Sequence, residues 1–270
     1  MTQFEDLQTL AARVPDGALV ALAPDYSWVP MDLVRALIRR NARDLELLAV
    51  PIGGMAADML IGAGAVKTLE AAAVSLGEAG PAPRFTDAVQ TGALVMRDTT
   101  CPAIHTALQA SEKGVPFMPL SGLIGSDLVR HRGDWKIVDD PMGSGGGQIL
   151  LLPEIKPDVA LFHSTKADKH GNVWIGRRRE LMTLAHASAT TLVTVETVED
   201  RDFLEDEDTA AGTLAAIYVT AIAEAPNGAW PQGLTGQYER DAEHIRGYAA
   251  EAKTEEGFRA YLDREVFGKS

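Results

Sequence analysis

Residues 140–175 decide the fold, and they read DPMGSGGGQILLLPEIKPDVALFHSTKADKHGNVWI. After a glycine cluster at 143–147 come two short apolar runs, at 149–153 and 159–162, and a polar loop at 163–172 follows the second run. Apolar runs of about 4 to 8 residues bounded by Gly, Pro and Asp are typical of central strands in a parallel or mixed sheet. Because open α/β sheets bind ligands in the loops at the ends of such strands, this segment predicts a site mounted on a sheet.

The rest of the chain repeats the strand–loop–helix pattern of a parallel sheet. We predict strands at residues 18–22, 44–50, 67–76, 93–98, 149–153, 159–162 and 190–198. We predict helices at residues 4–13, 31–40, 56–63, 85–92, 102–113 and 179–187. The fold class that follows is α/β, with an open, mostly parallel sheet and helices on both faces. We treat residues 1–270 as a single domain that ends in a helical C-terminal extension, from about residue 236 to 270.

Composition excludes several classes of protein. A net charge of −13 argues against nucleic-acid binding, because phosphate contacts need clustered Lys and Arg. The sequence contains no apolar run near the roughly 18 residues that a membrane span needs, and its acidic N-terminus does not read as a signal peptide. The single cysteine, Cys101, rules out an intramolecular disulfide, and we interpret it as a small residue at a helix start. We therefore expect a cytoplasmic protein with no membrane contact.

Four glycine-rich or polar loops each follow a predicted strand. Glycines let a ligand or a second backbone approach closely, and the helix that follows the first loop favours an anion at its N-terminus. Several such loops at one edge of a sheet predict a broad pocket for a long, anionic ligand, although each loop by itself is equally compatible with a tight turn. The candidate binding residues are Gly53, Gly54, Ser121, Gly125, Ser126, Gly145, Gly146, Gly147, Lys166, Asp168 and Asn172.

Asp98 is the candidate catalytic carboxylate, because it stands at the end of a predicted strand. The alternative for Asp98 is a surface or capping aspartate. No Gly-x-Ser-x-Gly elbow surrounds a serine, which disfavours an α/β-hydrolase, and no full G-x-G-x-x-G fingerprint supports a dinucleotide site. His163 and His170 lie seven residues apart, which is not a metal-ligand spacing, so we expect no metal site.

At this point the order of several blocks resembles a known family. G-V-P-F-M-P at 114–119, G-S-D-L at 125–128, K-P-D-V-A at 156–160 and A-D-K-H-G-N at 167–172 resemble the alpha subunit of family I CoA-transferases. Within that family, the sequence resembles the glutaconate CoA-transferase branch, which also contains the CoA hydrolases of steroid-ring degradation. The resemblance covers nearly the whole chain. It implies a beta subunit of related fold, an α2β2 or larger assembly, and coenzyme A as a substrate with no permanently bound cofactor.

The resemblance also implies a mechanism. In such transferases the acyl-CoA is attacked by a glutamate of the beta subunit, an acyl-glutamyl anhydride becomes a glutamyl-CoA thioester, and CoA passes to a carboxylic acid. The alpha chain would shape the acyl pocket, and its loop at 23–28 stands where many relatives have Gly-Gly. In hydrolase-like members an alpha-chain glutamate is implied in catalysis, and Asp98 stands at that place with a side chain one methylene shorter.

Three functions therefore stay open. The main hypothesis is the alpha subunit of a heteromeric CoA-transferase. The alternative on the same scaffold is an acyl-CoA hydrolase that cleaves a thioester or a C–C bond in ring degradation. The alternative of another class is a non-catalytic regulatory subunit that binds CoA or a phosphate ligand; it predicts ligand binding by this chain alone, whereas the enzymes predict activity only with a beta subunit.

Overall fold

Within residues 2–143 and 147–269, which the computed structural model describes, ten strands form one main sheet. Its strands are β1 Gln3–Glu5, β2 Leu19–Leu22, β3 Leu45–Ala49, β5 Val66–Ala71, β7 Val95–Asp98, β11 Val159–Asp168, β12 Val173–Trp174, β13 Thr190–Glu199, β14 Thr213–Leu214 and β15 Ala221–Glu224. The spatial order is β1-β15-β13-β11-β2-β3-β5-β7, and every pair along this path is parallel. The short β12 runs antiparallel to β11 and β14. The predicted α/β class with a mostly parallel sheet is confirmed.

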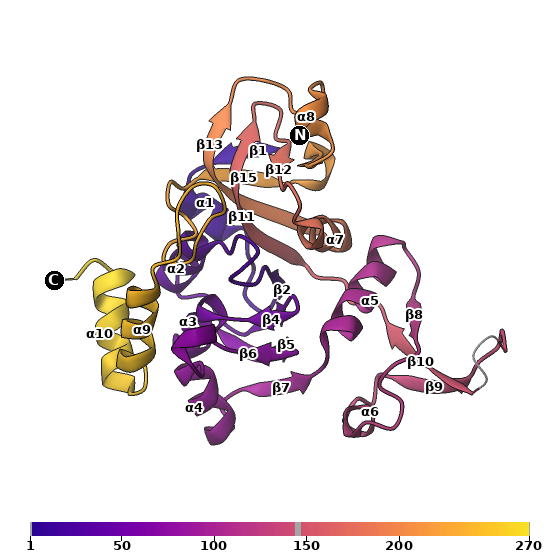
Figure 1. Ribbon diagram of the computed structural model, residues 1–270. Coiled ribbons are helices and arrows are strands. Elements are labelled where there is room, and N and C mark those ends of the chain that lie inside the picture. Colours follow the sequence, from indigo (N-terminus) through magenta and orange to yellow (C-terminus); the bar gives the residue numbers. More distant parts are fainter. Residues whose placement is uncertain (1, 144–146, 270) are drawn as a thin grey trace.

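Helices cover both faces of this sheet (Figure 1). The helices of the described ranges are α1 Leu7–Ala12, α2 Met31–Arg39, α3 Met55–Gly62, α4 Pro83–Thr91, α5 Cys101–Glu112, α6 Asp127–His131, α7 Arg179–Ala187, α8 Glu207–Ala210, α9 Ala242–Glu251 and α10 Glu255–Glu265. Of these, α6 lies beside the small sheet described below and not on the main sheet. None of the helices in the described ranges is long and apolar enough to cross a bilayer.

Alternation along the central strands explains why both faces are covered. In β2, Val20 and Leu22 pack into the core that includes α1, α2 and α3, whereas Ala21 packs on the opposite face against the core that includes α5 and α7. Successive side chains of a strand point to opposite faces of the sheet, so a strand that is apolar at every position must be buried on both faces. Strands that are apolar throughout therefore specify a central sheet between two layers of helices.

Two C-terminal helices confirm the predicted extension and are docked on the body. Asp241 caps α9 by accepting a hydrogen bond from the backbone N–H of His244 (2.9 Å). Tyr248 and Tyr261 are buried in the core that α2 and α3 also form. The Tyr248 hydroxyl donates to the buried carboxylate of Asp58 on α3 (2.6 Å), which ties α9 to the first half of the chain.

A small antiparallel sheet extends from the body beside α5, on the side opposite to α9 and α10 (Figure 1). Its strands, in the order β8-β10-β9, are β8 Phe117–Leu120, β10 Gln148–Pro153 and β9 Lys136–Asp139. We call residues 116–154 the arm. Leu150 and Leu152 of β10 pack on one face of this sheet with Trp135 and with Ala103 of α5.

The arm corrects one prediction, because residues 149–153 are not a central strand of the parallel sheet. Leu150 and Leu152 are buried while Ile149 and Leu151 are half-buried, so β10 is covered on one face only. A short apolar run does not distinguish a strand of the main sheet from one of a separate sheet, since periodicity carries no information about the pairing partner.

Three other boundaries differ from the predictions. The expected polar loop at 163–172 is wrong over its first half, because β11 continues to Asp168 and its polar residues pair with β13. The expected helix at 4–13 is divided into β1 and α1, because the Asp6 side chain accepts from the backbone N–H groups of Gln8 and Thr9 and starts the helix there. The expected strand at 67–76 is divided as well: β5 ends at Ala71, and β6 Ala73–Val74 pairs with β4 Ile52–Gly53.

Candidate functional site

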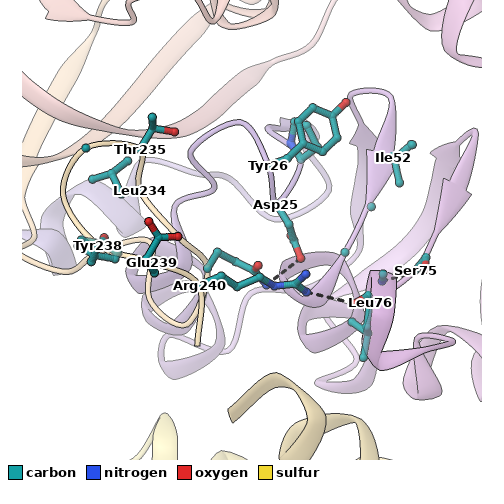
Figure 2. Close-up of a pocket in the computed structure, with 17 residues that line it drawn as sticks. Asp25, Tyr26, Ile52, Ser75, Leu76, Leu234, Thr235, Tyr238, Glu239 and Arg240 are labelled. Carbon is teal, nitrogen blue, oxygen red and sulfur yellow. Dashed lines mark hydrogen bonds between the residues drawn. The ribbon is translucent and has the colours of Figure 1, made fainter. Parts of the chain in front are cut away.

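A cavity of about 610 Å³ lies beyond the carboxyl ends of β2, β3 and β5 (Figure 2). Residues 24–26 follow β2, residues 52–54 follow β3, and residues 75–77 follow β5 and β6. Residues 232–236 and 238–240, from the segment before α9, form the remaining wall. We call this space the main cavity. Its position matches the general rule that open α/β sheets bind ligands beyond the carboxyl ends of their strands.

Asp25 is the central polar group of the main cavity. Its Oδ2 accepts hydrogen bonds from the backbone N–H of Met55 (2.8 Å) and from Nε2 of Gln232 (2.9 Å). Its Oδ1 is buried and has no hydrogen-bond partner in the described part of the chain. Burial raises the pKa of this carboxyl to about 6, although the hydrogen bond from Met55 and the positive charge of Arg240 act in the opposite direction.

Gly54 is required by the approach of Asp25. A Cβ atom on Gly54 would lie 2.1 Å from Asp25 Oδ2, closer than any real contact allows. The sequence predicted that glycines here let a second group approach and that an anion would sit at the helix N-terminus. That anion is the chain's own carboxylate, since Asp25 accepts from Met55, the first residue of α3. Gly53 and Gly54 both line the main cavity, and ligand binding by them stays a prediction.

The rest of the cavity lining contributes a guanidinium and a hydroxyl group. The Nη2 of Arg240 donates to the backbone carbonyl of Leu76 (3.1 Å) and joins the two sides of the cavity. The Oγ of Ser75 accepts from the backbone N–H of Gly77 (3.0 Å), so its own hydrogen can be donated to a ligand. The cavity thus combines hydrogen-bond donors, a carboxyl with a raised pKa and apolar walls, which suits a ligand with both polar and apolar parts.

Asp98, the predicted catalytic carboxylate, lies elsewhere at the same edge of the sheet. It is exposed at the end of β7 and borders an open hollow of about 660 Å³ that shares no lining residue with the main cavity. Arg132 is buried beside it: its Nη1 donates to the backbone carbonyl of Asp98 (3.2 Å) and to Oε1 of Glu70 (2.8 Å). The catalytic role of Asp98 stays a prediction.

The remaining predicted binding residues are spread over two further regions. Ser121, Gly125, Ser126 and Gly147 belong to the arm, and Gly145 and Gly146 lie outside the described residues. Lys166, Asp168 and Asn172 lie at the far end of β11. The expectation that all these loops meet at one edge of the main sheet is therefore wrong for the arm.

The polar atoms of Asp168 are engaged inside the protein. Its carboxylate accepts from the backbone N–H groups of His170 (2.9 Å), Asn172 (2.9 Å) and Phe203 (2.8 Å) and from the side-chain amide of Asn172 (2.7 Å). Lys166 pairs with Glu199 (3.2 Å). These contacts hold the turn after β11 and leave Asp168 no free lone pair for a ligand, while binding by Lys166 and Asn172 stays a prediction. Among the residues that the structure describes, no group of three or more His, Cys, Asp or Glu could hold a metal ion.

Sequence reasoning did not find Asp25, Gln232 or Arg240 as cavity residues. The available signal for Asp25 was a carboxylate just after a predicted strand, in the loop at 23–28. For Gln232 and Arg240 no local signal existed, because both lie more than 200 residues from Asp25 and reach it only through the fold.

Comparison with known proteins identifies the family. Residues 4–225 match the family model described as Coenzyme A transferase. The chain belongs to the coenzyme A transferase family.

Proteins whose names describe different reactions are similar to this chain. It is 30% identical to the A-type subunit of the 3-oxoadipate CoA-transferase of Pseudomonas knackmussii, over 94% of this chain and 90% of that protein. It is 32% identical to the cholesterol ring-cleaving hydrolase IpdA subunit of Rhodococcus jostii, over 88% of this chain and 83% of that protein. A 31% identical protein of Archaeoglobus fulgidus is longer, and the chain spans 57% of its length.

Solved structures of the coenzyme A transferase fold superpose on nearly the whole chain. Glutaconate coenzyme A-transferase from Acidaminococcus fermentans matches with a TM-score of 0.90 and 25% identity, over 99% of this chain and 89% of that chain. A variant of the decarboxylase AibA/AibB matches with a TM-score of 0.85 and 30% identity, over 97% of this chain and 99% of that chain. Proteins similar to this chain are therefore named as transferases, hydrolases and decarboxylases. The reaction must be argued from the site, because one fold can carry several functions.

Proposed function

We propose that this chain is the alpha subunit of a heteromeric CoA-transferase that moves CoA between an acyl-CoA and a carboxylic acid. The observation that carries the proposal is the main cavity, at the carboxyl ends of β2, β3 and β5 in a chain that matches the family over residues 4–225. Support for the partner comes from the relatives whose names describe one subunit of a CoA-transferase.

In the proposed mechanism the beta subunit supplies the nucleophile and the alpha chain binds the acyl group. The thioester is attacked by a glutamate carboxylate of the beta subunit, which releases the CoA thiolate and leaves an acyl-glutamyl anhydride. The thiolate then attacks the glutamyl carbonyl, releases the donor acid and forms the glutamyl-CoA thioester. An acceptor carboxylate then attacks the glutamyl-CoA thioester, which releases the CoA thiolate and forms a new anhydride. The thiolate attacks the acceptor's carbonyl in this anhydride, which gives the new acyl-CoA and restores the glutamate. The alpha chain binds the acyl group in the main cavity and keeps water from the anhydride.

Trapping the covalent intermediate tests this proposal. The chain is co-expressed with a candidate beta subunit, and the complex is incubated with an acyl-CoA in the absence of acceptor. Borohydride or hydroxylamine treatment followed by mass spectrometry is expected to reveal a modified glutamate on the beta subunit. Continuous release of free CoA without any adduct would contradict the transferase and favour a hydrolase, and binding of CoA by this chain alone without turnover of the complex would favour the regulatory subunit.

A hydrolase is the second candidate, and a specific observation favours it. Asp98 is an exposed carboxylate in an open hollow, and the relative named as a ring-cleaving hydrolase subunit is 32% identical. A general base contributes about 10²- to 10⁴-fold, so under this candidate Asp98→Asn lowers kcat by at least about 100-fold while the complex still assembles. Asp44→Asn is the matched control, because Asp44 is exposed, lies outside the hollow and has a positive φ that Asn tolerates. If the Asp98→Asn and Asp44→Asn complexes have equal kcat, Asp98 has no role in the reaction.

A further inference from the structure

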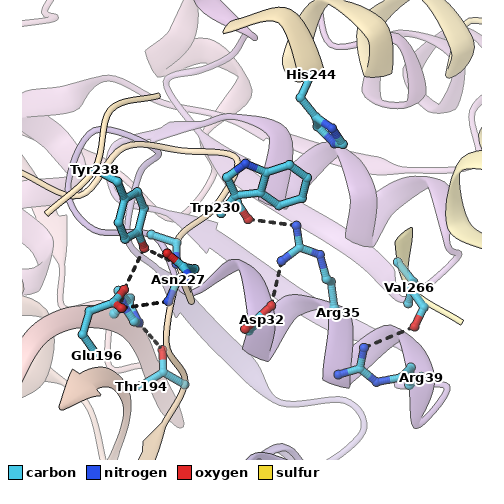
Figure 3. A network of polar contacts seen from close by, with 12 residues as sticks. Asp32, Arg35, Arg39, Thr194, Glu196, Asn227, Trp230, Tyr238, His244 and Val266 are labelled. Carbon is cyan, nitrogen blue, oxygen red and sulfur yellow. Dashed lines mark hydrogen bonds and ion pairs between the residues drawn. The ribbon is translucent and has the colours of Figure 1, made fainter. Parts of the chain in front are cut away.

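One wall of the main cavity is a long segment that a single carboxylate fixes at two points (Figure 3). This segment, residues 225–241, runs from the end of β15 to the start of α9, and we call it the wall segment. Glu196 on β13 accepts a hydrogen bond from the backbone N–H of Asn227 (2.7 Å) through Oε2 and from the Tyr238 hydroxyl (2.8 Å) through Oε1. The two anchored residues lie near opposite ends of the wall segment.

Tyr238 connects this carboxylate to the cavity. It lines the main cavity, its hydroxyl accepts from the backbone N–H of Ala229 (3.1 Å), and its backbone exchanges two hydrogen bonds with Leu234 (2.9 and 3.1 Å). The turn between Leu234 and Tyr238 contains Thr235 and Gly236, which also line the cavity. The position of the Tyr238 ring therefore sets the position of this turn.

The remaining contact of Glu196 is a buried histidine. Nε2 of His163 lies 2.9 Å from Oε1 of Glu196, and Nδ1 lies 2.8 Å from Oγ1 of Thr194. Burial alone raises the pKa of Glu196, but the hydrogen bonds from His163, from the Asn227 N–H and from Tyr238 outweigh burial and lower this pKa overall. Glu196 is therefore a carboxylate at neutral pH and attracts both donors of the wall segment.

The wall segment also packs directly on the histidine. A Cβ atom on Gly228 would lie 2.7 Å from Cε1 of His163, so the backbone at this position rests on the ring. The contacts run from a hydroxyl (Thr194) to an imidazole (His163) to a carboxylate (Glu196), in the same order as in a catalytic triad. His163 and Thr194 are, however, fully buried within the sheet. No substrate can reach the threonine oxygen, so this group cannot act as a nucleophile and its contacts serve the wall segment.

We propose that Glu196 is a positioning residue that acts through Tyr238 to hold the wall segment in the shape that binds the acyl group. This inference rests on the proposed function, because it takes the main cavity to be the acyl site. The neighbouring contacts agree with it: Gln232 and Arg240, whose side chains bond to Asp25 and to the Leu76 carbonyl, both lie in the wall segment. If Tyr238 shifts, both cavity contacts shift with it.

The test compares two tyrosines with the same kind of hydrogen bond. Tyr238→Phe removes the bond to Glu196 together with the bond from the Ala229 N–H, whereas Glu196→Gln leaves the tyrosine hydroxyl in place. Tyr248→Phe removes the bond to Asp58, which lies outside the main cavity. Each complex with the beta subunit is assayed with acetyl-, butyryl- and glutaryl-CoA as donors, and kcat, KM and Tm are measured. For the donor that the wild type turns over best, we expect Tyr238→Phe to raise KM about 10-fold with kcat within about 2-fold, the change that about 1.4 kcal/mol produces.

Tyr248→Phe is expected to lower Tm and leave KM unchanged. Glu196→Gln keeps the size of the side chain and loses the charge, so it is expected to raise KM for the same donor as Tyr238→Phe, and the double variant should be less than additive. An unchanged KM in Tyr238→Phe, or equal KM changes in both tyrosine variants, would overturn the positioning role. A wild-type complex that turns over none of the donors, by transfer or by hydrolysis, would instead contradict the proposed function and the inference with it.

Discussion

At the scale of single residues, the main cavity depends on a carboxyl group that the fold forces into an unusual environment. Asp25 lies over Gly54 and against the start of α3, and its Oδ1 is buried with no hydrogen-bond partner among the described residues. A buried charge that is incompletely paired is costly, and the group responds with a raised pKa. Asp25 is therefore neutral more readily than a surface aspartate is.

This shift predicts a dependence of stability on pH. The folded pKa of about 6 lies above the ordinary aspartate value of 3.8, so the proton binds more tightly to the folded state. The resulting stability is fully present below the unfolded pKa and is lost as the pH rises through about 6. A shift of this size corresponds to about 3 kcal/mol at most.

Asp25→Asn removes the titration and retains an oxygen that can accept from Met55 and Gln232. We therefore expect the difference in unfolding free energy, wild type minus variant, to fall by about 2 to 3 kcal/mol between about pH 4 and about pH 8. Denaturant unfolding at the two pH values measures this difference. A difference that stays constant with pH would show that Asp25 titrates normally.

At the scale of elements, the body was easier to predict than the arm. The helices at 31–40 and 179–187 were predicted within one residue of α2 and α7. In the first of them, the apolar residues Leu33, Leu37 and Ile38 repeat with the helical period. The strands of the arm could not be assigned to a separate sheet, since pairing partners are not encoded in a local pattern. The cavity wall was missed for the same reason, because Asn227 and Tyr238 meet Glu196 only in the folded chain.

The C-terminal helices give a prediction at this scale. α9 is joined to α3 by the hydrogen bond from Tyr248 to Asp58, and Phe258 of α10 lies so close to Gly62 that a Cβ there would be 2.6 Å from its ring. Tyr248→Phe leaves one oxygen of the buried Asp58 without its donor, which costs about 1 to 3 kcal/mol.

Because the lost bond joins α9 to α3, we expect hydrogen exchange in Tyr248→Phe to rise in α9 and α10 before it rises in the main sheet. Tyr261→Phe is the matched variant: it removes a bond to His244 (2.8 Å) and leaves no carboxylate unpaired, so its effect should be smaller. Equal exchange in α9 and in β11 of Tyr248→Phe would mean that the extension unfolds only together with the body.

At the scale of the whole molecule, the arm presents an apolar face that the described part of the chain does not cover. Paired residues of an antiparallel sheet share a face, and Leu151 pairs with Pro119 while Pro153 pairs with Phe117. This face is opposite to the one that Leu150 and Leu152 bury against α5. Phe117 is 49% exposed within this group. An apolar face on a projecting sheet is typical of a surface that another chain covers.

We therefore expect the proposed beta subunit to contact the outer face of the arm. Phe117→Ser removes an aromatic anchor from this face and should weaken the complex by at least about 10-fold, because aromatic residues in the centre of an interface commonly contribute about 2 kcal/mol or more. The Tm of the isolated chain should change little, since the side chain is already half exposed. Ile217→Ser is the control, because Ile217 is 85% exposed and lies in the segment between β14 and β15, outside the arm. Light scattering after size-exclusion chromatography measures assembly of both variants, and loss of the complex in Ile217→Ser alone would place the partner on the body instead of the arm.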